Sequence, residues 1–256
     1  MKQTALPHET IKTFKTIKTL SYMKKSIFLA ALVLISAGCF AQKANVSKAR
    51  SLSEAETPDY AAARATIQEA LVNDETKNQA NTWYVAGYIG YKEFDAANLN
   101  RQMGRNIDVE AWGAAVYESV GYWNKAYELA LIPTYDKKGR AKYDTRTPKN
   151  ILPKLHEYFN NQPLIIAGFT AYENNNPSLA YDMFMAHCNL PESKIFQDNP
   201  EEAAKLLVDT SFYTCLYYAG RFAYEAQRFE DAIATLERMN SEHANKNALR
   251  KEIIYA

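Results

Sequence analysis

The sequence predicts an all-α fold in which antiparallel helix hairpins stack one on another. The first observation is a repeated unit of Ala-Gly, two residues, a small residue and an aromatic ring, at 86–91, 167–172 and 219–224. The second is composition, because Gly and Pro number only nine each among 256 residues. Ala, Leu, Glu, Lys and Gln, which favour helices, fill most of the periodic segments. An internal repeat determines the whole architecture, so these units organise the prediction.

Residues 23–41 predict a secretory signal peptide. Met23-Lys24-Lys25 is basic, 26–35 is apolar after its first residue, and small residues follow to Ala41, with cleavage expected there. The apolar run is shorter than the roughly 20 residues that a helix needs to span a bilayer. The alternative to a signal peptide is a buried N-terminal helix. We therefore expect an exported protein of the periplasm or cell envelope.

Two features upstream of Gln42 leave alternatives open. Cys39 follows Ser36-Ala37-Gly38 and resembles a bacterial lipobox, although Ser36 stands where that motif usually has Leu. We expect membrane association only if Cys39 is lipidated. Residues 1–22 precede a complete signal, so we interpret them as an upstream extension of a gene that starts at Met23, or else as an unusually long basic leader.

The remaining chain, 42–256, is expected to form one helical domain. We predict helices at 46–55, 60–73, 80–97, 107–131, 150–174, 178–189, 200–226 and 229–239, and the start of another at 247. Breaks are expected near Gln162-Pro163 and allowed near Asp209. Segment 98–106 is an insertion, 192–199 is a linker, and Thr147 with Pro148 marks a helix start. Residues 134–147 alternate around a turn and predict a short β-hairpin or ordered loop, whose basic tip we interpret as solvated.

Small residues in the repeated unit predict close helix packing. Gly87 and Gly90 lie on one face of their helix with Trp83 and Ala86. Each Gly costs a helix about 1 kcal/mol relative to Ala. Two of them on one face therefore indicate that a neighbouring helix backbone comes close there.

Aligning the units on their glycines reveals a longer pattern. Trp83, Leu164 and Leu216 stand four residues before the glycine, and Ala180 and Ala232, then Phe184 and Leu236, follow at fixed offsets in the last two units. This resembles the tetratricopeptide repeat (TPR), with its Leu replaced by Ala86, Ala167 and Ala219, and its first Tyr by Gly90, Ala171 and Ala223. Exported Bacteroidetes-like TPR proteins look most similar. The resemblance implies a right-handed superhelical stack, a TPR-like α-solenoid, with units at about 44–75, 80–133, 150–191 and 200–244.

No catalytic motif accompanies the repeat. The sequence contains no Gly-x-Gly-x-x-Gly, Walker loop or His-Glu-x-x-His, and His8, His156, His187 and His243 are scattered. We therefore expect a protein that is not an enzyme and has no cofactor or metal. His187 is expected to pack inside a hairpin, whereas Cys188 and Cys215 either pair in an oxidising compartment or remain buried thiols.

The charge of the body excludes one class of partner. Beyond residue 41 the chain has 24 basic and 28 acidic residues, whereas nucleic-acid binders present a basic face. We therefore expect no nucleic acid as a partner.

The resemblance places the first helix of each unit on a concave face. The residues this implies as groove contacts are Tyr84, Tyr88, Tyr91, Phe169, Tyr172, Tyr217, Arg221 and Tyr224, rich in the Tyr and Arg enriched at interface cores. Alternatively, the rings fill space between hairpins. Two functions remain: a non-enzymatic exported scaffold that binds a protein or an extended peptide, or a glycan-binding or carbohydrate-uptake accessory protein of the cell envelope.

Overall fold

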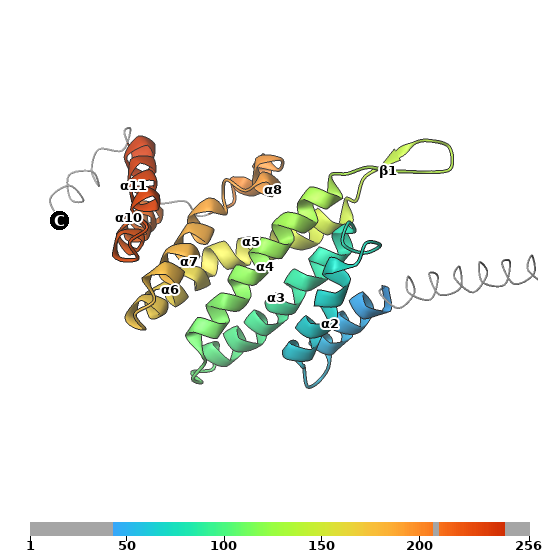
Figure 1. Cartoon of the computed structure of the whole chain (residues 1–256), viewed down its shortest axis with the longest axis horizontal. Coiled ribbons are helices and arrows are strands. Elements are labelled where there is room, and N and C mark those ends of the chain that lie inside the picture. The colour runs from blue at the N-terminus through green and yellow to red at the C-terminus, as the bar shows by residue number, and fades with distance from the viewer. Residues whose placement is uncertain (1–42, 207–209, 244–256) are drawn as a thin grey trace, which may run out of the picture.

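The structure, a computed structural model, describes residues 43–206 and 210–243, and its described part is mostly helical (Figure 1). The predicted all-α class is therefore confirmed. Four predictions lie outside the described residues: the extension at 1–22, the signal peptide at 23–41, the break near Asp209 and the helix beginning at 247. None of the helices in the described part is long and apolar enough to cross a membrane.

The described elements follow the chain across the molecule in Figure 1. They are a helix over 43–54, α2 (Tyr60–Val72), α3 (Ala80–Gln102), α4 (Val109–Ala130), β1 (Thr134–Tyr135), β2 (Ala141–Lys142), α5 (Arg146–Asn161), α6 (Pro163–Glu173), α7 (Pro177–Asn189), α8 (Lys194–Gln197), α9 (Pro200–Ala203), α10 (Thr210–Glu225) and α11 (Phe229–His243). The two strands pair antiparallel, with Thr134 opposite Lys142, which confirms the predicted hairpin.

Side-chain caps fix where several helices begin. Asp59, Asp108 and Asn176 each accept a hydrogen bond from the backbone N–H three residues later, at the starts of α2, α4 and α7. These bonds satisfy N–H groups that a helix leaves without an internal partner. The α5 helix begins at Arg146, two residues before the predicted start at Pro148, because the Asp144 carboxylate accepts from the N–H groups of Arg146 and Thr147.

Successive helices pack as pairs along the chain. The closest pairs are α3 with α4, α6 with α7, and α10 with α11, and each pair contacts the next through α4 with α6 and α7 with α10. A Cβ on Gly87 would lie 2.5 Å from the Trp123 ring, and one on Gly90 would lie 2.5 Å from Ser119 Oγ. As the residue number rises along α3, the number of the contacted residue on α4 falls, so the two helices run antiparallel.

The other two repeated units make the same contact with their partner helices. A Cβ on Gly168 would lie 2.6 Å from the Phe184 ring, and one on Gly220 would lie 2.7 Å from Leu236. The predicted close approach of a neighbouring backbone is confirmed at Gly87 and Gly90, where a Cβ would lie 3.0 Å from the Ser119 carbonyl oxygen and 2.6 Å from that of Ala115, whereas the nearest atoms to a Cβ on Gly220 all belong to the Leu236 side chain. Sequence reasoning missed Gly113 on α4, where a Cβ would lie 2.0 Å from the Cβ of Ala167 on α6.

One helix boundary differs clearly from the prediction. Helix α3 continues to Gln102, so most of the expected insertion at 98–106 is helical, and the helix stops just before Gly104, which has φ of 72°. The segment over 200–226, in which the sequence allows a break, contains α9, which ends at Ala203, and α10, which begins at Thr210. The break at Gln162 is confirmed by its φ of 52° between α5 and α6.

Helix α5 packs against α3, α4 and α6 rather than pairing with one helix. Its Tyr158 is fully buried in a group of rings, with centroids 4.8 Å from Phe94 and 5.6 Å from Trp123. This cluster ties α3 and α4 to α5 through edge and stacked ring contacts, which add to the free energy of apolar burial. As a result, α5 covers part of the face of α3.

Candidate functional site

The three groove contacts predicted on α3 lie largely in the interior. Tyr84 is only 6% exposed, so the expectation that it contacts a ligand is corrected. Tyr88 and Tyr91 are half-buried, because Lys154 of α5 lies 5.0 Å from the Tyr91 ring centroid, and the Tyr91 hydroxyl donates to Glu157 Oε2 at 3.1 Å. These rings fill the space between α3 and α5.

Burial also sets the protonation of these residues. It raises the pKa of Tyr88 to about 12, with hydrogen bonding to Glu54 adding to the effect. Burial lowers the pKa of Lys154, opposed by the charge of Glu157. Burial therefore keeps the Tyr88 phenol neutral to a higher pH than in an exposed tyrosine.

The other five predicted residues lie near one another on the surface formed by α6 and α10. We call this set the α6–α10 surface: Phe169, Tyr172, Tyr217, Arg221 and Tyr224. The Tyr172 ring stacks on Phe222 at 4.6 Å, and the Arg221 guanidinium lies 6.0 Å from the Tyr172 centroid. Arg221 Nε also donates to Glu225 Oε1 at 2.9 Å. These contacts hold a ring and a cation in place beside each other.

The α6–α10 surface remains open to solvent. Phe169 is 37% exposed and Tyr224 is 64% exposed, whereas Tyr217 is half-buried beside Tyr218, with centroids 5.6 Å apart. Tyr217, Arg221 and Tyr224 follow helical spacing along α10, as Phe169 and Tyr172 do along α6. The contact between Arg221 and Tyr172 joins these two helical rows.

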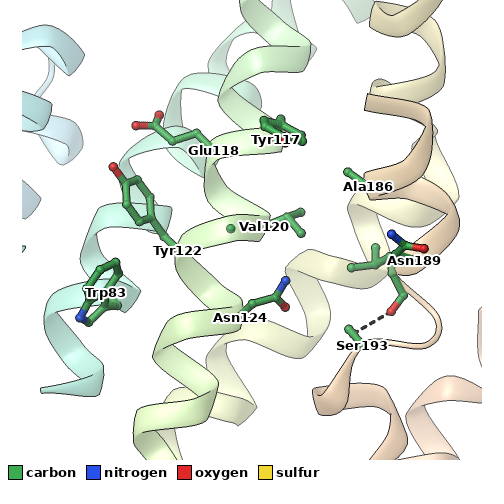
Figure 2. Close-up of a pocket in the computed structure, with 11 residues that line it drawn as sticks. Trp83, Tyr117, Glu118, Val120, Tyr122, Asn124, Ala186, Asn189 and Ser193 are labelled. Carbon is green, nitrogen blue, oxygen red and sulfur yellow. Dashed lines mark hydrogen bonds between the residues drawn. The ribbon is translucent and has the colours of Figure 1, made fainter. Parts of the chain in front are cut away.

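Sequence reasoning missed a hollow of about 520 Å³ on another part of the molecule. We call it the α4–α7 hollow, and Figure 2 shows its walls. It is lined by Trp83, Tyr117, Glu118, Val120, Gly121, Tyr122, Asn124, Ala186, Asn189, Leu190 and Ser193. Its volume is in the range of small-molecule sites. Its residues come from α3, α4, α7 and the turn after α7, so no local spacing in the sequence could have grouped them.

Several polar groups of the α4–α7 hollow already have partners. Trp83 Nε1 donates to the Lys77 carbonyl at 2.6 Å, and Tyr122 Oη accepts from Gln68 at 2.8 Å. By contrast, the exposed Asn124 amide makes no hydrogen bond within the described ranges and points into the hollow in Figure 2. A Cβ on Gly121 would meet no atom within 4 Å, so no neighbouring group packs against the α4 backbone at this point.

The His and Cys residues considered from the sequence are buried in the interior. His187 stacks on Phe159 at 4.6 Å, and burial lowers its pKa to about 4, which confirms that it packs in the interior. Cys188 and Cys215 are both buried. Within residues 43–206 and 210–243, no three His, Cys, Asp or Glu side chains are placed to hold a metal ion.

Comparison of the chain with protein-family models, with curated proteins and with solved structures gives no significant match to any of them.

Proposed function

We propose that this protein is an exported, non-enzymatic scaffold of the TPR type that binds a protein or an extended peptide across the α6–α10 surface. Export would use the signal at 23–41 and place the scaffold in the periplasm or cell envelope. The observation that carries the proposal is the position of Tyr172 and Arg221. Arg221 is exposed and lies beside the half-buried Tyr172, and the exposed Phe169 and Tyr224 stand on the same two helices.

The chemistry of this surface suits a polypeptide ligand. Tyr and Arg dominate binding energy at protein interfaces, because they offer large contact area together with hydrogen-bond donors. Tyr172 is held by Phe222 and Arg221 by Glu225, so less side-chain freedom is lost on binding. An extended peptide could place apolar side chains on Phe169 and a carboxylate or carbonyl against Arg221.

The order of helix contacts supports the TPR part of the proposal. In a stack of hairpins, each unit packs its own two helices together and contacts only its neighbours. The pairs α3–α4, α6–α7 and α10–α11, joined through α4–α6 and α7–α10, follow this order. Helix α5 would then be an insertion that occupies the face of α3 and leaves the same face of α6 and α10 open.

A peptide selected from a displayed random library against the purified chain would test the proposal. Its affinity, measured by fluorescence anisotropy, should fall at least about tenfold in Tyr172→Ala/Arg221→Ala, because hot-spot side chains contribute about 2 kcal/mol each. The control is Tyr135→Ala/Lys138→Ala, which removes a ring and a cation from the exposed β-hairpin. Equal affinity of the two double variants would disprove binding at the α6–α10 surface.

The α4–α7 hollow favours glycan binding as a second candidate function. Aromatic rings such as Trp83, Tyr117 and Tyr122 offer apolar faces, on which the C–H faces of a sugar can stack. The amides of Asn124 and Asn189 could bond its hydroxyls. Binding on a glycan array that is lost in Asn124→Ala but kept in Tyr172→Ala would favour this function. Peptide binding with no glycan signal would exclude it.

A further inference from the structure

A second hollow, of about 490 Å³, lies where the helix over 43–54 and α2 meet α3 and α5. We call it the acidic hollow, because its wall includes the carboxylates of Glu54, Glu56, Asp95 and Glu157 but only one cation, Lys92. The helix over 43–54 also ends at this hollow, and the C-terminal end of a helix carries partial negative charge. The local field therefore favours a cation.

The carboxylates are only partly balanced by the protein itself. Lys92 Nζ lies 3.6 Å from Asp95, and Glu54 accepts from Arg50 at 3.0 Å. Glu56 is exposed and forms no ion pair with any residue in the described part. Burial is the main cause that raises the pKa of Glu157, and the charge of Asp95 adds to it, whereas the hydrogen bond from Tyr91 and the charge of Lys154 lower it. Glu157 is therefore partly compensated by Tyr91 and Lys154, and Glu56 is the wall carboxylate without an ion-pair partner in the described part.

Asn98 provides an independent indication that the hollow receives a ligand. It is only 8% exposed and lines the hollow. Its side-chain amide makes no hydrogen bond to any residue that the structure describes. Its polar atoms are not among the described side-chain atoms that are sealed from solvent without a partner, so the amide opens into the hollow. A ligand with an N–H donor would supply the missing partner for its carbonyl oxygen.

The shape of the wall narrows the class of cation. No three carboxylates in the described ranges are placed to hold a metal ion, so the acidic groups are spread around the hollow. Between them lie the apolar side chains of Pro58, Ala96 and Leu99, the last of which is 54% exposed. Such a wall suits a ligand with an aliphatic stem and a charged head, because the stem can pack on apolar surface while the head stays among polar groups.

We propose that the acidic hollow binds an aliphatic primary ammonium group. Its methylene chain lies on Ala96 and Leu99, and its three N–H donors reach Asp95, Glu157 and the Asn98 carbonyl oxygen. The group belongs to the lysine side chain of a peptide or to a free polyamine, two sources with the same chemistry. This site is separate from the α6–α10 surface and does not depend on the function proposed for it.

Calorimetric titration of the full chain with N-acetyl-lysine N-methylamide and with spermidine tests the proposal. The matching norleucine amide has the same stem without the charge, and should bind at least about tenfold more weakly than the lysine amide. Tighter binding of the lysine amide than of spermidine identifies a peptide lysine as the source, and the reverse order identifies a polyamine. Equal binding of the lysine and norleucine amides would overturn the proposal.

Variants locate the bound ammonium group. Asp95→Asn and the exposed Glu56→Gln should each weaken lysine-amide binding, whereas Asn98→Asp should strengthen it by adding a carboxylate. The control is Glu128→Gln, which removes one exposed carboxylate on α4 beside Lys125. Melting curves identify any variant that fails to fold, and Glu56→Gln keeps the test decisive because its side chain is exposed. If Glu56→Gln and Asn98→Asp both bind like the control, the assignment to this hollow is wrong.

Discussion

The crossing of α4 and α6 offers the sharpest test of how these helices pack. Gly113 on α4 faces Ala167 on α6, and a Cβ placed on Gly113 would lie 2.0 Å from the Ala167 Cβ. Ordinary contact between carbon atoms is near 3.5–4.0 Å. Gly113→Ala therefore forces the two helices apart by more than an ångström, or forces both backbones to bend.

The expected magnitude combines two opposing effects. Overpacking a close-packed contact costs about 3 kcal/mol, while Ala in place of Gly in a helix stabilises by about 1 kcal/mol. We expect Gly113→Ala to lower the free energy of unfolding by about 2 kcal/mol. Gly121→Ala on the same helix meets no atom within 4 Å, so it should raise the free energy of unfolding by about 1 kcal/mol.

A double variant isolates the contact. With Ala167→Gly present, the nearest remaining atoms to the new Cβ are Met183 Cε at 3.5 Å and the Ala167 Cα at 3.6 Å, both ordinary contacts. Gly113→Ala/Ala167→Gly should therefore recover to within about 1 kcal/mol of the parent chain. Urea unfolding followed by circular dichroism measures all four proteins.

Two results would refute this reasoning. If Gly113→Ala stabilises the protein as much as Gly121→Ala does, the helices do not approach closely at this point. If Ala167→Gly fails to rescue Gly113→Ala, the steric conflict lies elsewhere. Either outcome would remove the argument that small residues set the α4–α6 distance.

Three further predictions concern the interior. Because burial lowers the pKa of His187 to about 4, the unfolded chain binds a proton that the folded chain refuses. His187 should leave the free energy of unfolding unchanged above pH 6.5 and lower it by about 3 kcal/mol as the pH drops to 4. Urea unfolding at each pH measures this loss, which should be absent in His187→Phe. The Tyr158 hydroxyl is buried without a hydrogen-bond partner among the described atoms. Tyr158→Phe should therefore raise the free energy of unfolding by about 1 kcal/mol and raise the melting temperature. A lower melting temperature would show that the hydroxyl is hydrogen-bonded. Gly90→Ala brings a Cβ within 2.6 Å of the Ala115 carbonyl. It should lower the free energy of unfolding, measured with a chemical denaturant, by about 1–2 kcal/mol. Unchanged stability would contradict this steric argument.

The sequence by itself determined the helical class, most helix positions and the role of the repeated glycines. Periodicity and capping act over a few residues, so they can be read directly from the chain. The same local logic predicted the turn at Gln162 and the hairpin of β1 and β2. It did not predict the start of α5, because Asp144, three residues before the expected cap Thr147, accepts from the first N–H groups of the helix.

Only the tertiary structure decided which predicted contacts face solvent. Tyr91, Tyr172 and Tyr224 hold the same place in the three repeated units, yet α5 packs over Tyr91 whereas Tyr224 is open to solvent. Lys154 and Glu157, which cover Tyr91, are distant from it in sequence. The α4–α7 hollow and the acidic hollow are also built from separate helices. Burial at such places depends on which distant helices meet, and a local pattern in one helix cannot encode that.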